Sequence, residues 1–326
     1  MSKQRMNNST IPWVEKYRPA HFDTIVLDPI NRTLFENIIS KKYFPNLLFY
    51  GPPGTGKTTT IINLINEFQS KHFKINKSLV IHLNASDERG IDIIRNQIHS
   101  FVKSKNMFEI GFKFVILDEV DYMTKNAQHA LKSLLQTCSG DIKFCLICNY
   151  ISKIEEPLKN EFTCIRFNQL PKNDIYKFIK TILVNENLSI NERAIDMIQH
   201  LYQSDIRSMI NFIQLNQNLT VDEWDCKIIN IEVLANIRKL LHSTSENTDD
   251  IIKTIYEASV QFNTDKRSIL QAYLNYVIRN CPTDVTSEYV DVMCEILHNT
   301  DVGAGDLVNY FCYQLNGLSN KPPFAS

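Results

Sequence analysis

The sequence lacks a charge excess, a long apolar run, an internal repeat and a low-complexity tract. Its 326 residues include 35 Lys and Arg against 36 Asp and Glu, a balance that excludes a histone-like protein acting through bulk charge. No run of about 20 apolar residues is present, so no transmembrane helix is predicted. The polar N-terminus has no apolar signal segment, and the 44% hydrophobic content excludes a largely disordered chain. We therefore expect a globular intracellular protein with no membrane contact.

The sequence does not predict disulfide bonds for its cysteines. There are eight in a long chain with no predicted signal peptide, which favours reduced thiols. Cys145 and Cys148 form a C-x-x-C pair inside an apolar run, with no second pair and no histidine pair at the spacing of a zinc site. We interpret both as buried thiols of a strand; zinc or redox chemistry is the less favoured alternative.

Continuous apolar runs alternate with helical periodicity in the first half of the chain. Strands are predicted at 46–50, 79–83, 113–117 and 143–148, and helices at 58–69, 91–102 and 126–137. Because the strands are apolar on both faces, the pattern indicates an α/β fold with a parallel sheet covered by helices on both sides.

The second half of the chain is predicted to be helical. Helical patterns begin near Pro171 and continue to about 217, and a polar, turn-like segment follows at 216–225. Further helices are predicted at 231–241, 248–262, 266–279, 285–298 and 302–317. These changes predict three domains: an α/β domain at 1–167, a small helical domain at 168–225 and an all-α domain at 226–326.

A phosphate-binding loop is predicted between the first strand and the first helix. Residues 51–58 (GPPGTGKT) fit G-x-x-x-x-G-K-[ST] in the strand–helix context that the motif requires. Its glycines let backbone N–H groups surround phosphates, and the helix adds its positive N-terminus. Lys57 is expected to reach the β- and γ-phosphates and Thr58 to bind Mg²⁺. The alternative is a Gly-rich turn without a ligand.

Acidic residues follow the strand predicted at 113–117. Asp118, at its end, has the position of a Mg²⁺ ligand in such a fold. Glu119 is suited to polarise an attacking water, which predicts hydrolysis rather than binding alone. Asn149 ends the next strand and is placed to orient the same water. The alternatives are a solvated acidic turn for the carboxylates and an ordinary turn residue for Asn149.

Several short segments, in order along the chain, carry a resemblance to a known family. They are 13–19 (WVEKYRP), 51–58 (GPPGTGKT), 84–90 (NASDERG), 117–124 (LDEVDYMT), 127–128 (AQ) and 148–150 (CNY). This string resembles the small subunits of replication factor C, the AAA+ clamp loader. The resemblance is dense over the first two-thirds of the chain and extends over the last third only in helical character.

The resemblance implies an AAA+ ATPase that binds ATP and Mg²⁺ through a P-loop domain followed by a helical lid and a C-terminal helical collar. Subunits of this family form an open spiral that opens a PCNA-type sliding clamp and loads it at a primer–template junction. The implied partners are therefore other clamp loader subunits, the clamp and primer–template DNA bound without sequence preference. The implied location is the nucleus or a cytoplasmic viral replication compartment. Little ATPase activity is expected from the chain alone.

The resemblance also assigns roles to residues around the nucleotide. Asn149 matches sensor 1, and Arg207 matches sensor 2 with Ser204 in place of the usual glycine; the alternative for Arg207 is a surface ion pair. The implied catalytic residues are Lys57, Glu119, Asn149 and Arg207, and the implied Mg²⁺ ligands are Thr58 and Asp118. The implied nucleotide-binding residues are Val14, Arg18, Gly51, Pro52, Pro53, Gly54, Thr55, Gly56, Lys57, Thr58, Thr59, Asn149 and Arg207.

Three basic residues match positions that face DNA in the family. Arg89, Arg95 and Lys153 are expected to contact phosphates without reading bases, which suits a protein that accepts any sequence. Solvated surface charges are the alternative. Gln128 matches a position thought to link DNA binding to the catalytic glutamate, and a polar residue on a helix surface is its alternative.

One position departs from the family pattern. Family subunits carry a Ser-Arg-Cys motif whose arginine reaches into the neighbouring ATP site. Counting back from residues 166–170 places this motif at 160–162, so Glu161 occupies the position of the arginine, and no other arginine lies between residues 96 and 165. A carboxylate there would repel the γ-phosphate. Our hypothesis is that the subunit binds ATP but does not complete its neighbour's site; a different local alignment is the alternative.

Other classes stay open on the sequence alone. One is a non-hydrolysing or finger-deficient scaffold subunit of a replicative or checkpoint-type clamp loader. Another is a helicase or Holliday-junction motor, which shares the phosphate-binding loop but lacks the W-x-E-K-Y-R-P segment.

Overall fold

The computed structural model of the chain describes residues 11–86, 97–104, 111–138, 140–221, 224, 231–242, 248–262, 264–299 and 302–319. The chain divides into two compact units. The first is Met1–Asn187 with Tyr202–Gln217, and the second is Leu188–Leu201 with Asn218–Ser326. This division runs through the segment predicted as the small helical domain, and the three-domain boundaries stay a prediction.

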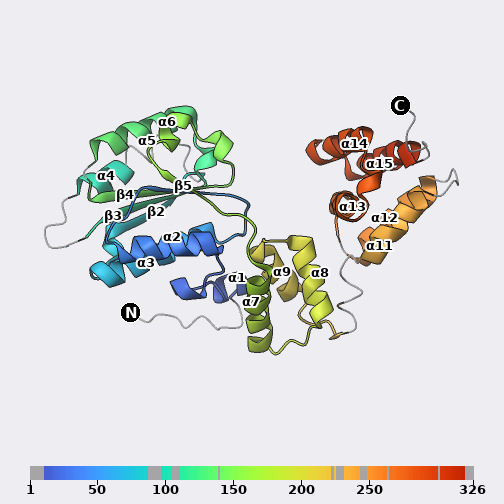
Figure 1. Cartoon of the computed structure of the whole chain (residues 1–326), viewed down its shortest axis with the longest axis horizontal. Helices are drawn as coiled ribbons and strands as arrows, with labels where there is room; N and C mark the ends of the chain where they lie inside the picture. The colour runs from blue at the N-terminus through green and yellow to red at the C-terminus, as the bar shows by residue number, and fades with distance from the viewer. Residues whose placement is uncertain are drawn as a thin grey trace. The chain divides into compact units, whose positions relative to one another are not determined.

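The first unit is an α/β structure (Figure 1). Its helices and strands are α1 (Trp13–Lys16), α2 (Pro29–Ser40), β1 (Leu47–Tyr50), α3 (Lys57–His72), β2 (Val80–Asn84), α4 (His99–Lys103), β3 (Lys113–Asp118), α5 (Lys125–Thr137), β4 (Ile142–Cys148), α6 (Glu156–Lys159), β5 (Thr163–Arg166), α7 (Lys172–Asn185) and α9 (Ile206–Leu215). The predicted strands and the helices after Thr58 and Asn126 are confirmed within a few residues. The predicted helix 91–102 lies partly outside the described residues.

The sheet is parallel, with the strand order β2-β3-β4-β1-β5. Tyr50 of β1 pairs with Cys148 of β4, and Leu117 of β3 pairs with Leu146 of β4, so these strands end nearly level. In a parallel sheet the carboxyl ends of all strands lie at one edge. The loops that follow β1, β3 and β4 therefore meet at this edge. They carry the predicted phosphate-binding loop, the residues Asp118 and Glu119, and Asn149.

Helices cover both faces of the sheet, as Figure 1 shows for α2 and α3 on one side and α5 and α6 on the other. Alternate strand residues point to opposite faces. Phe49 and Ile116 enter one apolar core with the α2 and α3 side chains, and Leu48 and Leu117 enter the other with the α5 side chains. Burial on both faces explains the continuous apolar runs and confirms the predicted α/β fold.

Strand β5 and the helices α1, α2 and α6 were not predicted from the sequence. Strand β5 pairs with β1 at the sheet edge, and of its four residues only Ile165 is buried. An exposed edge strand leaves no continuous apolar run. Helix α2 begins at Pro29 after Asp28, whose carboxylate accepts a hydrogen bond from the Ile30 N–H at 2.9 Å. That Asp-Pro start was a readable signal for a helix N-terminus.

The second unit is helical in its described part. It contains α8 (Glu192–Tyr202, the last residue of which falls in the first unit), α11 (Ile231–Leu241), α12 (Thr248–Gln261), α13 (Lys266–Asn280), α14 (Ser287–His298) and α15 (Ala304–Ser319). Helices α11 to α15 share one apolar core that includes Ile237, Ile255, Leu274 and Phe311. Their predicted positions are confirmed within about two residues.

Cys145 and Cys148 lie in β4, each about 1% exposed, which confirms the predicted burial. Burial raises the pKa of both thiols, and that of Cys148 reaches about 12, so both stay protonated at neutral pH. Among the residues that the structure describes, no helix is long and apolar enough to cross a membrane.

Candidate nucleotide-binding site

The loop between β1 and α3 needs glycine at defined positions. Gly51, Gly54 and Gly56 have φ values of 141°, 72° and 83°, a region that favours glycine. A Cβ on Gly51 would lie 2.1 Å from the Phe167 carbonyl oxygen, and one on Gly54 would lie 1.8 Å from Asp205 Oδ1. The spacing of glycines in the motif therefore reflects both backbone conformation and close packing.

Lys57 points into this loop. Its Nζ donates to the carbonyl oxygens of Gly51 and Pro52 at 2.8 and 2.7 Å. A third hydrogen bond reaches Asn149 Oδ1 at 3.0 Å. The side chain is only 7% exposed. Burial lowers the pKa of Lys57, and the Asp118 and Asp121 carboxylates oppose that change, so the ammonium is held among neutral oxygens with two carboxylates nearby.

Thr58 and Asp118 converge from α3 and β3. Thr58 Oγ1 donates to Asp118 Oδ2 at 2.7 Å, and the Glu119 N–H donates to Asp118 Oδ1 at 2.9 Å. Burial acts to raise the pKa of Asp118, but the His82 ring at 3.8 Å and these two hydrogen bonds outweigh it. The pKa therefore lies below its usual value, and the carboxylate is ionised at neutral pH.

These two oxygen-bearing side chains fit a magnesium ion. Mg²⁺ prefers oxygen ligands and is held in nucleotide sites by one or two protein groups together with phosphates and water. The described residues contain no group of three His, Cys, Asp or Glu side chains that could hold a metal ion by themselves. Mg²⁺ needs only one or two ligands from the protein. The Thr58 hydroxyl and the ionised Asp118 carboxylate, which contact each other, can supply them.

Glu119 adopts a left-handed backbone conformation, with φ 56° and ψ 37°. For a residue other than glycine this costs about 1–3 kcal/mol, and such strained residues cluster at functional sites. The turn directs the chain from β3 into the short 3₁₀ helix Val120–Tyr122. The strain sets the half-buried Glu119 at the carboxyl edge of the sheet beside Asp118, as expected for a group that acts on a water near the phosphates.

Asp121 is a residue to which the sequence assigned no role. It is 6% exposed, and neither of its carboxylate oxygens has a hydrogen-bond partner in the described structure. Its charge acts on two neighbours: it favours the charged form of Lys57, and after burial it is the next cause of the raised pKa of Cys148. A buried carboxylate without hydrogen bonds is costly, and Lys57 is a cation close enough to interact with it electrostatically.

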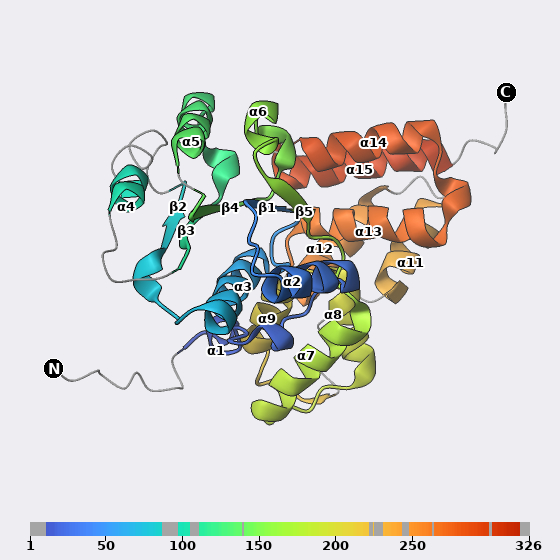
Figure 2. The same ribbon diagram turned by 60° about the vertical axis from the view of Figure 1, so that its left-hand side comes forward.

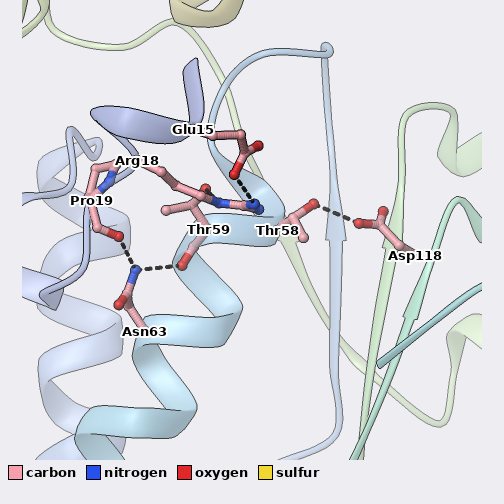
Figure 3. A network of polar contacts seen from close by, with 7 residues as sticks. All are labelled: Glu15, Arg18, Pro19, Thr58, Thr59, Asn63 and Asp118. Carbon is pink, nitrogen blue, oxygen red and sulfur yellow. Dashed lines mark hydrogen bonds and ion pairs between the residues drawn. The ribbon is translucent and has the colours of Figure 1, made fainter. Parts of the chain in front are cut away.

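The N-terminal segment closes one side of the loop (Figure 3). Arg18 Nε donates to Thr59 Oγ1 at 3.2 Å, and its Nη1 donates to Glu15 Oε2 at 3.3 Å. Asn63 Nδ2 donates to the carbonyl oxygens of Pro19 and Thr59, both at 2.9 Å. These contacts fix Arg18 against the first turn of α3.

Helix α1 also contacts α9, which lies beside it in Figure 2. The Trp13 N–H donates to Gln214 Oε1 at 3.0 Å, and the Trp13 side chain is buried. Lys16 Nζ lies 2.6 Å from Glu186 Oε1 just beyond α7, and Tyr17 donates a hydrogen bond to the same carboxylate. The N-terminal segment thus joins the phosphate-binding loop to the helices α7 and α9.

A cavity of about 330 Å³ lies between these segments. Its wall includes apolar side chains from the N-terminal segment, α7 and α9, and the cations Arg18 and Arg207 beside Gly54 and Gly56. This size and mixture of apolar wall with a few charged groups is typical of a small-molecule site. The structure brings Val14, Arg18, Arg207 and the loop residues 54–56 to one cavity, whereas Lys57, Thr58 and Asn149 are not among the residues that line it.

Arg207 lies in the first turn of α9, at the cavity wall. Asp205 caps this helix by accepting from the Ser208 N–H at 3.0 Å. No carboxylate of the described residues pairs with Arg207, so the surface ion pair that was its alternative does not occur there. Ser204, in place of glycine, accepts from the Leu170 N–H at 2.9 Å and so connects the segment before α7 to the turn before α9.

Gln128 is buried and holds two loops together. Its exposed fraction is 2%, so the alternative of a helix-surface residue is wrong. Its Nε2 donates to the carbonyl oxygens of Met123 and Lys153 at 3.4 and 3.0 Å, and its Oε1 accepts from the Glu155 N–H at 2.8 Å. The side chain therefore connects the turn after Glu119 with the loop that carries Lys153.

The remaining predicted residues have different outcomes. Arg89 and Arg95 lie outside the described residues. Lys153 is exposed in the loop after β4, and its DNA contact stays a prediction. Glu161 is exposed between α6 and β5, and it lines a polar cavity with Lys143 and Asn160.

Comparisons with known proteins agree with this geometry. Residues 47–170 match the ATPase family associated with various cellular activities (AAA). Replication factor C subunit 3 of Saccharomyces cerevisiae is 40% identical over 193 residues, which cover 59% of this chain and 56% of that protein. Replication factor C small subunit 2 of Pyrobaculum islandicum is 41% identical over 196 residues, covering 60% of each chain. The chain thus spans little more than half the length of these relatives.

Solved structures show the same fold at low identity. The RuvB Holliday junction branch migration motor of Thermotoga maritima has a TM-score of 0.51 and 15% identity, with 81% of this chain and 91% of that chain covered. At this identity the likeness concerns the fold alone. Together these findings confirm the predicted P-loop fold and the predicted resemblance to replication factor C small subunits.

We expect Gly54→Ala to destabilise the first unit, because the new Cβ meets Asp205 Oδ1 and alanine is strained at a φ of 72°. The loss in free energy of unfolding should be about 1–3 kcal/mol, read from urea denaturation. Gly140→Ala is the matched control, since a Cβ there meets nothing within 4 Å. Equal stability of the two variants would contradict the packing described for Gly54.

We expect Gln128→Ala to lower the free energy of unfolding by about 1–3 kcal/mol, because the buried carbonyls of Met123 and Lys153 and the Glu155 N–H lose their partner. Gln136→Ala, at an exposed position of the same helix α5, is the control and should change stability by less than about 0.5 kcal/mol. The measurement is urea denaturation, and similar losses in both variants would be the contrary result.

Proposed function

We propose that the chain is an ATP-binding subunit of a clamp loader with ATPase activity inside a hetero-oligomeric ring. The observation that carries the proposal is the buried Lys57 ammonium, hydrogen-bonded to the loop and to Asn149 beside the Thr58–Asp118 pair. The AAA match over residues 47–170 and the similarity to replication factor C subunits support it.

Each residue of the site has a separate role when a nucleotide is bound. Lys57 exchanges its carbonyl partners for phosphate oxygens, and the loop N–H groups surround the phosphates. Thr58 and Asp118 hold Mg²⁺, which when bound neutralises charge on the phosphates. Glu119 accepts a proton from the attacking water, and Asn149 orients that water. Arg207 reaches the γ-phosphate from α9.

The proposed partners are other clamp loader subunits, a PCNA-type sliding clamp and primer–template DNA. Lys153, with Arg89 and Arg95, contacts DNA phosphates without reading bases, so binding is independent of sequence. The proposed location is the nucleus, or a viral replication compartment in the cytoplasm. In this assembly residues 168–225 form the lid of the chain and residues 226–326 form its collar.

A second candidate function is a scaffold subunit that binds nucleotide without cleaving it and without completing its neighbour's site. Glu161 favours it, because an exposed carboxylate stands where the family has its arginine finger. The intact Lys57, Asp118 and Glu119 favour hydrolysis in the chain's own site. The two functions differ in whether ATP is cleaved in this subunit or only bound.

Two substitutions separate binding from hydrolysis. Lys57→Ala should weaken ATP–Mg²⁺ binding by about 10- to 100-fold, the loss expected for hydrogen bonds to a charged group. Glu119→Gln should keep ATP binding and lower hydrolysis in this subunit's own site about 100-fold or more, since a general base is lost, so that the complex loses the contribution of this site. Binding is measured by calorimetry on the full chain, and hydrolysis by phosphate release with partner subunits, clamp and primed DNA.

The wild-type chain alone should hydrolyse ATP slowly, because the finger comes from another subunit. Rapid hydrolysis by the purified chain would refute this part of the proposal. ATP binding that is unchanged in Lys57→Ala would refute the nucleotide site itself. Normal hydrolysis by a complex containing Glu119→Gln would favour the scaffold function.

Glu161 has its own test in the reconstituted complex. If the subunit does not complete its neighbour's site, Glu161→Ala should leave clamp- and DNA-stimulated ATPase unchanged within about twofold, which is about 0.4 kcal/mol in the activation barrier. Glu161→Arg should keep or raise that rate, and Glu67→Arg, an exposed charge reversal on α3, is the control. Abolition of the stimulated ATPase by Glu161→Ala would show that the hypothesis is wrong.

A further inference from the structure

One lysine ammonium lies between two exposed tyrosine rings at the carboxyl edge of the sheet. Lys153 Nζ is 5.3 Å from the ring centroid of Tyr122 and 5.3 Å from that of Tyr150. Tyr122 is 62% exposed and Tyr150 is 60% exposed. We call these three residues the tyrosine–lysine cluster.

The backbone beneath the cluster is fixed by hydrogen bonds. The Lys153 N–H donates to the Tyr150 carbonyl at 3.2 Å, and the Tyr122 N–H donates to the Glu119 carbonyl at 3.0 Å. Gln128 holds the Lys153 carbonyl from the interior at 3.0 Å. The two rings are therefore presented from a rigid base, which lowers the entropy lost when a ligand binds.

Internal packing does not account for the cluster. A cation–π contact at an exposed site is weak, and the rings bury little apolar area while they stay in water. The nearby carboxylate of Glu155 pairs with Lys125 at 3.3 Å, and no carboxylate of the described residues pairs with Lys153. A free cation flanked by two exposed aromatic faces is an arrangement that binds a ligand carrying both an anion and a planar ring.

We propose that the tyrosine–lysine cluster binds single-stranded nucleic acid, with a phosphate on Lys153 and unpaired bases stacked on Tyr122 and Tyr150. Duplex DNA offers only its backbone here, because its bases are already stacked on one another. Stacking on tyrosine tolerates any base, so the cluster adds strand-type preference without sequence preference. The inference rests on the proposed function for its ligand and extends it from phosphate contact to recognition of unpaired bases.

The location gives the cluster a direct relation to the nucleotide site. Tyr150 follows Asn149 in the chain, and Tyr122 is hydrogen-bonded through its backbone to Glu119. A strand stacked on these rings therefore contacts one residue adjacent to Asn149 and one residue hydrogen-bonded to Glu119, the two groups proposed to act on the attacking water.

The test uses the full chain and a labelled oligothymidylate, with an abasic oligomer of equal length and charge as the second probe. Fluorescence anisotropy at several salt concentrations gives the affinity and its salt dependence. We expect the wild type to bind oligothymidylate at least about fivefold more tightly than the abasic strand, the factor expected for one stacked base. Replacing both cluster tyrosines by alanine should remove this difference, and replacing both by phenylalanine should retain it.

Lys153→Ala separates charge from stacking. It should lower the slope of log affinity against log salt by about 0.7, the value for one phosphate contact on a single strand, while the preference for oligothymidylate over the abasic strand remains. Tyr43→Ala, at a tyrosine that is 65% exposed elsewhere in the first unit, is the control and should change neither quantity.

Several results would overturn the inference. The double alanine variant could retain the oligothymidylate preference, or the wild type could bind neither strand at low salt. If the double alanine variant binds both strands normally but assembles poorly with partner subunits, the cluster is a protein interface. ATP binding on the same preparations, compared with Lys57→Ala, decides the proposed nucleotide site independently, so a failure of stacking leaves that result standing.

Discussion

The buried ammonium of Lys57 is the interaction on which the site depends. Because β1 and β4 are adjacent and end level, the loop after β1 and Asn149 after β4 reach the same point from segments 92 residues apart. The loop carbonyls and Asn149 replace the water that the ammonium loses, at a place where bound phosphates can later take over as partners. A shift of one strand by one residue would separate these groups. The site therefore depends on the register of β1 against β4.

Much of this arrangement was predictable because it is local. The loop, the strands that carry it and the polar residues at the strand ends each have a pattern within about ten residues. The strand order, the exposed edge strand β5 and the burial of Gln128 depend on contacts between distant segments, which no short pattern encodes. Ser204 is an example: it departs from the family pattern, and its hydrogen bond to the Leu170 N–H joins residues that are far apart in the sequence.

Electrostatics explains why the missed residue Asp121 belongs to the same site. Asp121 is a buried carboxylate with no hydrogen-bond partner in the described structure, and its charge favours the charged form of Lys57. Together with Asp118, the larger influence, it acts against the effect of burial on Lys57. Sequence reasoning named the acidic segment 118–121 but had no means of telling that its last member points inward.

The near-zero net charge does not describe the cavity, whose wall carries the cations Arg18 and Arg207 and one carboxylate, Glu15. Arg18 has Glu15 at 3.3 Å, Lys57 is bonded to neutral oxygens, and Arg207 has no carboxylate partner in the described structure. The charge of Arg207 itself acts against the charged form of Lys57. A polyphosphate relieves that repulsion by bringing anions to both cations, so its binding energy comes from local charges that the folded chain leaves incompletely compensated. The balance of 35 against 36 charges is therefore compatible with tight binding of an anion, because what matters is the charge within a few ångströms of the ligand.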